Sequence, residues 1–398
     1  ATYLALCNNA AFRELLADLA VSRADLVQAG LLPNPEVVYF FNVPEKPFKY
    51  AVELPLEAFW LRPCRLKIAD AENSRVAERL VQAALDLLRD TRQAYADLLL
   101  ARQRLRIAEQ GVVLRSRIAT LAEARLQAGD ATEQETATAR IDMLQAKQDA
   151  QRVSYDVDFA EERLRNFLGL SDFRGSLPLL EPVSEPGEIL EIEALVAEAV
   201  RTRPDALAVE HAVQGAIERW RFAKLGWIRL LGIADATSGR NTGHEFSPGL
   251  RVTVPVMNQN QGAIARAEAE LARAERQRRS VHNQIVLDVR QAHTRYLQAK
   301  TELAGLAGKV RPEVEGNIRR AEAAYKEGNA AYLLVLETTR QLLDTLGREA
   351  QLQADVRRAW ADLERGLGRR LALATHAPPP PAAVPTEKKR GFATDREE

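Results

Sequence analysis

Residues 249–271, GLRVTVPVMNQNQGAIARAEAEL, contain the pattern that decides the fold. Leu250, Val252 and Val254 alternate with Arg251 and Thr253, and a period of two residues gives a strand one apolar face and one polar face. A helical pattern follows from residue 262 onward. The stretch therefore predicts a strand that leads into a long helix.

The first half of the chain repeats this strand pattern. In PFKYAVELPL, Phe48, Tyr50 and Val52 alternate with Lys49 and Glu53. The preceding NPEVVYFFNV adds a partner strand, and Pro44, Glu45 and Lys46 are expected to form the turn between them. Each half of the chain thus predicts a pair of antiparallel strands, although residues 227–236 alternate poorly.

The helix expected after the first strand pair is far longer than a globular helix. From Pro63, a residue suited to a first helical turn, to Gln127 there is no further proline and one glycine, Gly111. As a helix this run would span roughly 100 Å. Its apolar residues recur in steps of three and four, as at Leu80 and Ala84, which is typical of a coiled coil.

The chain is a tandem repeat, because landmarks recur in the same order about 200 residues apart. The matching pairs are Asn9 with Pro204, Pro55 with Pro255, Gly129 with Gly328, and Gly169 with Gly368. Residues 1–195 form the first repeat, with strands at about 35–56 and helices at about 63–127 and 131–168. Residues 196–371 form the second, with strands at about 227–256 and helices at about 262–327 and 331–371. The Pro-rich, charged residues 372–398 are expected to be disordered.

Composition argues against several functions. Lys plus Arg and Asp plus Glu both number 55, so the net charge of zero gives no field that would attract nucleic acid. Cys7 and Cys64 lack metal-ligand spacing, and the five histidines, including His282 and His293, form no ligand motif. With no triad or phosphate loop either, we expect no enzyme, no cofactor and no bound metal.

Four strands with an apolar face cannot close into a barrel, so closure has to come from other copies of the chain. Three copies would supply twelve strands, each of about the length that crosses a bilayer. Phe59, Trp60 and Trp227 would form an interfacial aromatic belt, unless they cap an ordinary core. Polar positions expected to face the lumen are Lys49, Glu53, Arg251 and Thr253; positions expected to face lipid are Phe48, Tyr50, Val52 and Val254. Lys46, His244 and Glu245 are expected in outward loops.

Three features resemble the TolC family of outer-membrane efflux proteins: QAGLLPNPEV before the first strand, VTVPVMNQNQGAIARAEAEL at 252–271, and the two AG/EG turns with their following helices. The likeness covers roughly residues 5 to 371. Residues 258–264 are similar to the branch that serves exporters of cobalt, zinc, cadmium, copper or silver.

The resemblance implies a mainly α fold with a small β part. Long antiparallel coiled coils would form an α-barrel through the periplasm, and a homotrimer would build a twelve-stranded β-barrel in outer-membrane lipid. The duct would be passive, with a periplasmic adaptor and an inner-membrane pump, expected to be of the resistance-nodulation-division type, delivering heavy-metal cations. A drug-efflux or type I secretion duct and a soluble coiled-coil scaffold stay open as alternatives.

The turns between the long helices are the candidate site. The resemblance implies that they form the closed periplasmic end and dock the adaptor, and acidic groups there would attract cations. The residues are Gly129, Asp130, Ala131, Thr132, Glu133, Glu135, Gly328, Asn329, Ala330 and Ala331. Ordinary helix capping by Asp130 or Thr132 is the competing explanation.

Overall fold

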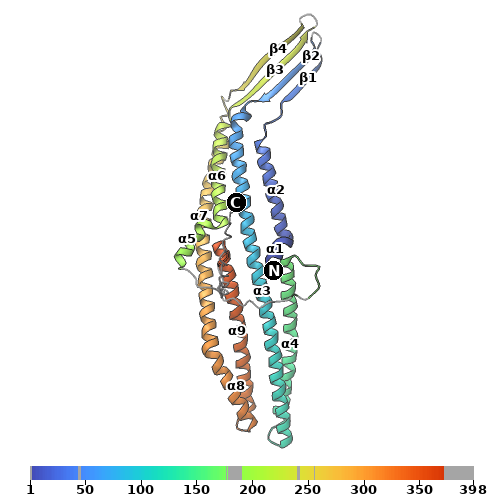
Figure 1. Cartoon of the computed structure of the whole chain (residues 1–398), viewed down its shortest axis with the longest axis vertical. Helices are drawn as coiled ribbons and strands as arrows, with labels where there is room; N and C mark the ends of the chain where they lie inside the picture. The colour runs from blue at the N-terminus through green and yellow to red at the C-terminus, as the bar shows by residue number, and fades with distance from the viewer. Residues whose placement is uncertain are drawn as a thin grey trace, which may run out of the picture.

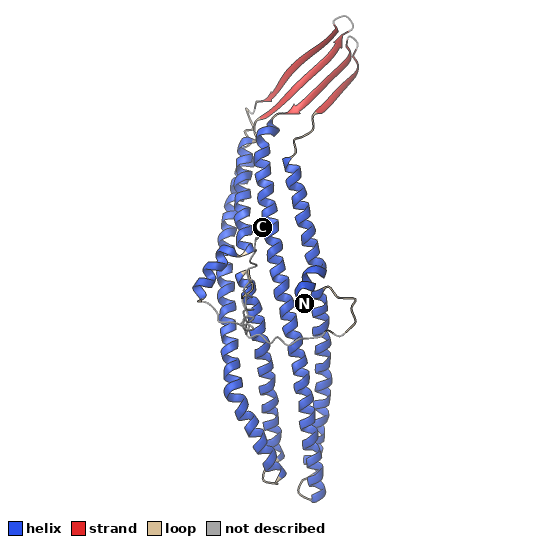
Figure 2. Ribbon diagram, viewed as in Figure 1, coloured by secondary structure: helices blue, strands red, loops and turns tan. Residues whose placement is uncertain are grey.

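The computed structural model describes residues 2–43, 46–175, 177, 191–239, 243–254 and 256–371. A small sheet stands at one end of a bundle of long helices (Figures 1 and 2). Pro44, Glu45, Pro255 and the tail at 372–398, all subjects of the sequence predictions, lie outside the described residues. The fold is therefore mainly α with a small β part, as the sequence predicts.

Both halves of the chain contain helix, strand pair, long helix and returning helix in this order. The first half contains α1 (Thr2–Asn8), α2 (Ala10–Gly30), β1 (Glu36–Val43), β2 (Lys46–Pro55), α3 (Glu57–Ala128) and α4 (Glu133–Leu168). The second contains α5 (Ile192–Thr202), α6 (Pro204–Leu225), β3 (Arg229–Gly239), β4 (Gly243–Thr253), α7 (Gln261–Gly305), a π-helical segment (Leu306–Val310), α8 (Arg311–Lys326) and α9 (Tyr332–Leu367).

The four strands form one antiparallel sheet in the order β1-β2-β3-β4. Tyr50 in β2 lies opposite Tyr39 in β1 and Ala236 in β3, which fixes the register. Lys46 pairs with Val43 across the first hairpin, so it belongs to β2 and not to the turn predicted for it. Within the described chain, β1 and β4 each keep one edge without a partner strand.

The lower helices lie side by side in the order α4, α3, α9 and α7–α8 (Figure 1). Helix α3 packs on both α4 and α9, and α9 packs on α7 and α8. Small apolar residues make close packing possible along this layer, for example Ala119, Ala122 and Ala139 between α3 and α4. The lower half of the chain is therefore a single layer of helices whose outer members are α4 and α7–α8.

In each repeat, the helix before the strand pair (α2 or α6) starts beside the end of the last helix (α4 or α9). We call this contact the joint of the repeat. Asn9 caps α2 by accepting a hydrogen bond from the Phe12 N–H, and its Nδ2 donates to the Phe167 carbonyl at 3.2 Å. In the second repeat, Arg203 precedes α6 and its Nη1 donates to the Gly366 carbonyl at 3.4 Å. The two joints hold equivalent places in the repeat but use different side chains.

Helix α3 begins at Glu57, so the prediction that it starts at Pro63 is wrong. The start is fixed by β3, because the Leu56 N–H donates to the Leu230 carbonyl at 2.8 Å and Glu57 Oε2 accepts from the Leu230 N–H at 3.1 Å. Pro63 lies inside the helix, where it cannot donate to the preceding turn. The contact with the sheet thus overrides the local preference of proline for a helix start.

The second long helical run, predicted for about 262–327, extends from Gln261 to Lys326 and contains a π-helical segment that the sequence analysis does not predict. The π segment Leu306–Val310 separates α7 from α8, and Pro312 lies in the first turn of α8. Pro312 has no N–H to donate to the preceding turn, so one hydrogen bond of the helical ladder is missing there, as it is at Pro63 in α3. None of the five residues of the π segment is buried.

Candidate functional site

The first helical turn is built by glycine and a threonine cap. Gly129 has φ of 85°, which a residue with a side chain rarely adopts, and the Asp130 N–H donates to the Arg125 carbonyl at 2.9 Å. Thr132 Oγ1 accepts from the Glu135 N–H at 3.1 Å and caps α4. Capping therefore explains Thr132, whereas Asp130 is exposed at the end of the hairpin.

The second turn has the same backbone and a different cap. Gly328 has φ of 80°, and the Asn329 N–H donates to the Ala324 carbonyl at 2.8 Å. Asn329 Nδ2 donates to Glu327 Oε2 at 3.3 Å. Ala331 takes the cap position of α9 without a side-chain hydrogen bond.

Two tyrosines of the second hairpin donate hydrogen bonds to carboxylates of the first. Tyr325 OH donates to Glu135 Oε1 at 2.8 Å, and Tyr332 OH donates to Asp142 Oδ2 at 2.5 Å. The Arg125 guanidinium lies 4.7 Å from the centre of the Tyr325 ring. The first and second hairpins are thus held together by hydrogen bonds from neutral phenols to carboxylates.

Both phenols titrate far above neutral pH. Burial, together with the hydrogen bond to Glu135, raises the pKa of Tyr325 to about 12. Burial and the Asp142 carboxylate likewise raise the pKa of Tyr332. Both side chains therefore stay protonated and can donate at neutral pH.

Among the predicted tip residues, Glu135 contacts the opposite hairpin and Ala330 packs on a small apolar cluster. The cluster consists of Ile118, Ala321, Tyr325 and Val335. The sequence analysis missed Tyr325, Tyr332, Asp142 and Arg125. One tyrosine on each side of the Gly328 turn could have indicated this contact, because aromatic rings in a short polar turn are usually there to pack against a neighbouring segment.

The register of the sheet puts Lys49, Glu53, Arg251 and Thr253 on one face. Two ion pairs follow this face, Lys49 Nζ with Asp235 Oδ2 at 3.9 Å and Arg251 Nη2 with Glu53 Oε1 at 3.3 Å. The opposite face exposes large apolar side chains: Val37, Phe41, Tyr50, Val52, Phe246, Leu250 and Val252.

Other predicted sheet residues are placed as follows. Val254 directly follows β4 and is exposed, as are Phe59, Trp60 and Trp227 at the junction of sheet and helices. His244 and Glu245 begin β4 instead of lying in a loop, whereas the side chains of Lys46 and Phe48 lie outside the described part of the structure.

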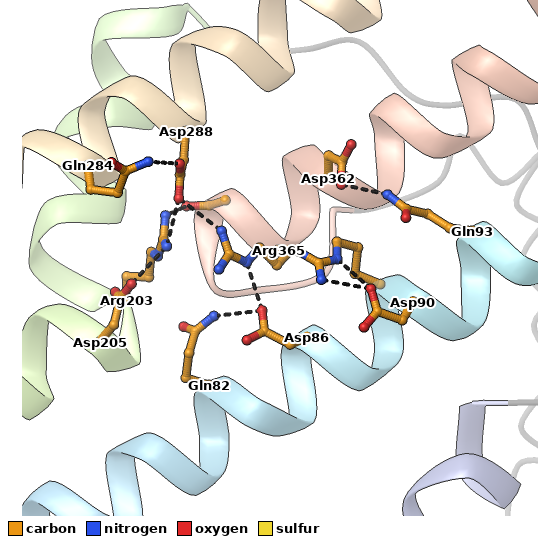
Figure 3. A network of polar contacts seen from close by, with 12 residues as sticks. Gln82, Asp86, Asp90, Gln93, Arg203, Asp205, Gln284, Asp288, Asp362 and Arg365 are labelled. Carbon is orange, nitrogen blue, oxygen red and sulfur yellow. Dashed lines mark hydrogen bonds and ion pairs between the residues drawn. The ribbon is translucent and has the colours of Figure 1, made fainter. Parts of the chain in front are cut away.

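A polar network crosses four helices at the level of the second joint (Figure 3). Arg203 Nη2 donates to Asp288 Oδ2 on α7 at 3.0 Å, and the same oxygen accepts from Arg365 Nη1 on α9 at 2.9 Å. Arg365 Nε then donates to Asp86 Oδ1 on α3 at 2.8 Å. Arg203 is only 1% exposed and the other three side chains are partly buried, so the network is a brace that connects the start of α6 with α7, α9 and α3.

The charges of this brace are matched. Burial opposes ionisation of Asp288, but hydrogen bonds from Gln284 and Arg203 outweigh it and lower the pKa of the carboxyl. Burial raises the pKa of Asp362, which accepts from Gln93 Nε2 at 2.7 Å. The arrangement is structural, since each charged group faces a charged or hydrogen-bonding partner of this chain.

One side of the helical layer has a polar groove. A groove of about 700 Å³ lies between α3, α8 and α9, and its charges are largely satisfied, as by Arg311 Nη1 and Glu349 Oε1 at 3.2 Å. Among the described residues, no three His, Cys, Asp or Glu side chains are grouped so that they could hold a metal ion.

In the described ranges, no helix combines the length and the apolar character needed to cross a membrane.

Known proteins share both the sequence pattern and the fold. The chain is 21% identical over 360 residues to the cobalt-zinc-cadmium resistance protein CzcC of Cupriavidus metallidurans, covering 88% of this chain and 85% of that one. The crystal structure of CusC superposes with a TM-score of 0.78 at 18% identity, covering 93% of this chain and 91% of that one. The outer membrane protein VceC of Vibrio cholerae gives 0.76 at 16% identity, with 92% and 95% covered.

A four-stranded sheet standing on long antiparallel helical hairpins is therefore the fold of outer-membrane channel proteins. Residues 1–170 and 196–369 match the family described as outer membrane efflux protein. The chain belongs to this family, as the resemblance of its sequence predicts.

Proposed function

We propose that three copies of this chain form a passive exit duct across the outer membrane. The observation that carries the proposal is the sheet, which has two open edges and one exposed apolar face. Open edges and exposed apolar side chains are both unfavourable in water, and a closed barrel in lipid removes both problems. Pairing β1 of one copy with β4 of the next would close the barrel.

In this barrel the two faces of the sheet have separate roles. Lys49, Glu53, Arg251 and Thr253 face the lumen, where water solvates the ion pairs of this face. Tyr50, Val52 and Val254 face lipid, together with Phe48. The exposed Phe59, Trp60 and Trp227 lie at the membrane interface.

The helices continue the passage through the periplasm. The 72 residues of α3 span about 110 Å, which gives the wall its length. A periplasmic adaptor meets its lower end, and an inner-membrane pump of the resistance-nodulation-division type delivers the solute. The duct itself performs no catalytic step.

The two helical turns form the adaptor-docking end and the gate. The supporting observations are the exposure of Asp130 and the tyrosine ties between the hairpins. Asp130→Arg reverses a charge at the end of the duct and leaves the Thr132 cap in place. We expect it to lower solute resistance conferred on cells, measured as growth in toxic solute. Unchanged resistance and unchanged conductance would remove Asp130 from the docking surface.

Heavy-metal cations are the proposed solute, on the grounds of the similarity to CzcC along most of both chains. A drug-efflux or secretion duct has the same architecture and is the alternative. Expression of the chain with its cognate adaptor and pump in a metal-sensitive strain separates the two, because metal tolerance rises only if metal ions are exported.

The proposal is tested by planar-bilayer conductance of detergent-purified protein. A trimeric duct predicts discrete ion-conducting steps, and the double variant Tyr325→Phe with Tyr332→Phe should raise the open fraction by loosening the tip. A protein that stays in solution without detergent and never conducts would be the scaffold instead, and would refute the duct.

A further inference from the structure

Helix α4 carries an exposed apolar stripe that none of the described residues covers. Residues that pack on α3, such as Ala139 and Leu164, lie on one side of α4. At about 100° per residue, the stripe falls on the opposite side of the helix. Its members are Ile141, Leu144, Tyr155 and Phe159, and Phe159 is 73% exposed. Because α4 is the outer member of the helical layer, this stripe points away from the layer toward whatever lies beside it.

The π segment Leu306–Val310 offers a surface of the opposite shape at the other edge of the layer. Gly308 lies in it and Gly305 directly precedes it, and a Cβ added at either would meet no atom within 4 Å. Leu297 on α7 and Val310 add exposed apolar surface at 45% and 46% exposure. This edge thus has exposed apolar side chains next to two glycines with open space, whereas the opposite edge bears aromatic rings.

A chain of contacts across the layer puts these two surfaces at the same level. Phe159 lies half a turn from Glu161, and Arg311 directly follows the π segment. Glu161 contacts Arg102 at 2.9 Å, Arg104 contacts Gln351 at 2.7 Å, and Glu349 contacts Arg311 at 3.2 Å. In a ring of copies related by rotation, the α4 stripe of one copy would therefore meet the π segment of the next.

Charge and sheet edges favour the same neighbour. Asp156 and Asp158 are exposed beside the α4 stripe, whereas Lys300 and Lys309 are exposed around the π segment. The open edge of β1 lies on the same side of the molecule as α2 and α4, and that of β4 on the side of α6 and α7 (Figure 1). A copy that pairs its β4 with β1 of a neighbouring copy also brings its π segment toward α4 of that neighbour.

We propose that Tyr155 and Phe159 of one copy pack on the glycine-lined π segment of the next copy, and that this contact closes the helical wall. The inference rests on the proposed function, since it requires a ring of copies. The contact explains the π segment, because a widened turn that contains glycine accommodates aromatic rings that a regular helix with larger side chains would exclude.

Disulfide trapping tests the contact directly. In a background of Cys7→Ser and Cys64→Ser, Phe159→Cys is combined with Gly308→Cys and oxidised in the detergent-purified full chain. The two Cα atoms need to approach within about 7 Å, so the pair should give covalent trimers on a denaturing gel. The matched control combines Gly308→Cys with Val113→Cys. Val113 is also exposed, but it lies on α3, which is not an edge helix of the layer. This control pair should stay monomeric on the gel.

The outcomes separate the inference from the proposed function. A trimer by mass that yields no Phe159–Gly308 cross-link overturns the inference and leaves the duct intact, and a monomer by mass overturns both. As a second measurement, Phe159→Asp should raise the concentration at half-assembly by about tenfold or more, because a buried aromatic contact is lost. Val113→Asp should not change it, and equal effects of the two variants would also contradict the contact.

Discussion

The two repeats of this chain have the same order of elements, but different interactions hold their joints. At the first joint, Asn9 makes a helix cap and one hydrogen bond to the Phe167 carbonyl. At the second, Arg203 makes the matching bond to Gly366 and also joins the brace with Asp288. The comparison shows that a duplicated topology fixes where the joint lies but not which side chains make it.

The long helices differ in the same way. Helix α3 runs without interruption for 72 residues, and its Gly111 lets Leu343 of α9 approach closely. Its counterpart is divided by the π segment, where glycines face open space. We infer that α3 is specialised for packing inside the chain, whereas its counterpart α7–α8 keeps a surface for a neighbour.

The largest expected effect is on the second joint. Arg203→Ala leaves the partly buried Asp288 with one fewer cation, and breaking a buried ion pair costs at most about 3–5 kcal/mol. The matched control is Arg340→Ala on α9, whose side chain is 71% exposed and 3.9 Å from Asp344, and it should cost less than about 1 kcal/mol. Denaturant unfolding followed by circular dichroism measures both.

Acid unfolding sharpens this prediction. The lowered pKa of Asp288 means that its carboxylate stabilises the fold fully above pH 3.8, the ordinary value, and that this stabilisation is lost as the pH falls through the lowered pKa. Asp288→Asn should flatten that part of the stability profile. An identical profile in the variant would show that the brace contributes nothing.

The next effect concerns the tip, where the two repeats meet. Tyr325→Phe removes a hydrogen bond to the Glu135 carboxylate, which costs about 1.5–3 kcal/mol. Since the pKa of Tyr325 is raised to about 12, its contribution is complete below pH 10.0 and is lost as the pH rises from there toward about 12. Alkaline unfolding of the wild type and the variant should converge above that range; curves that stay parallel would contradict the assignment.

A smaller effect is expected from filling the close approach of α3 and α9. A Cβ at Gly111 would lie 3.0 Å from Leu343 Cδ1, so Gly111→Leu overpacks the contact by about 1–3 kcal/mol, partly offset by better helix propensity. Gly347→Leu on α9 is the control, because a Cβ there meets nothing within 4 Å. Thermal melting should fall for the first variant only.

The smallest effect is at the first joint. Asn9→Ala removes the cap of α2 and the bond to Phe167, with an expected cost of about 1 kcal/mol. The comparison of the joints predicts that this loss is well below that of Arg203→Ala in the same unfolding assay. Equal losses would mean that the brace adds nothing to the second joint.

The sequence predicted what depends on local geometry. The alternation from Phe48 to Glu53 indicated strands because the period of a strand is set by its own backbone, and Gly129 and Gly328 indicated turns because few residues adopt a positive φ. The π segment is not predicted, although Pro312 is present in the sequence, because the repeat pattern favours a second long helix like the first.

The rest could not be predicted because it depends on residues far apart in the chain. Tyr325 and Glu135 are separated by 190 positions, and Arg203 and Asp288 by 85. No local pattern specifies such partners; they follow only from the way in which distant helices pack together. The division of the chain at 195/196 and the roles of the lumen, lipid and tip residues stay predictions.

The most direct test of the account is native mass measurement of the full chain in detergent, combined with imaging of the same particles. The account predicts three times the chain mass of 44.2 kDa and a ring in which each sheet edge meets the next copy. A particle of a single chain mass whose sheet closes on itself would contradict it.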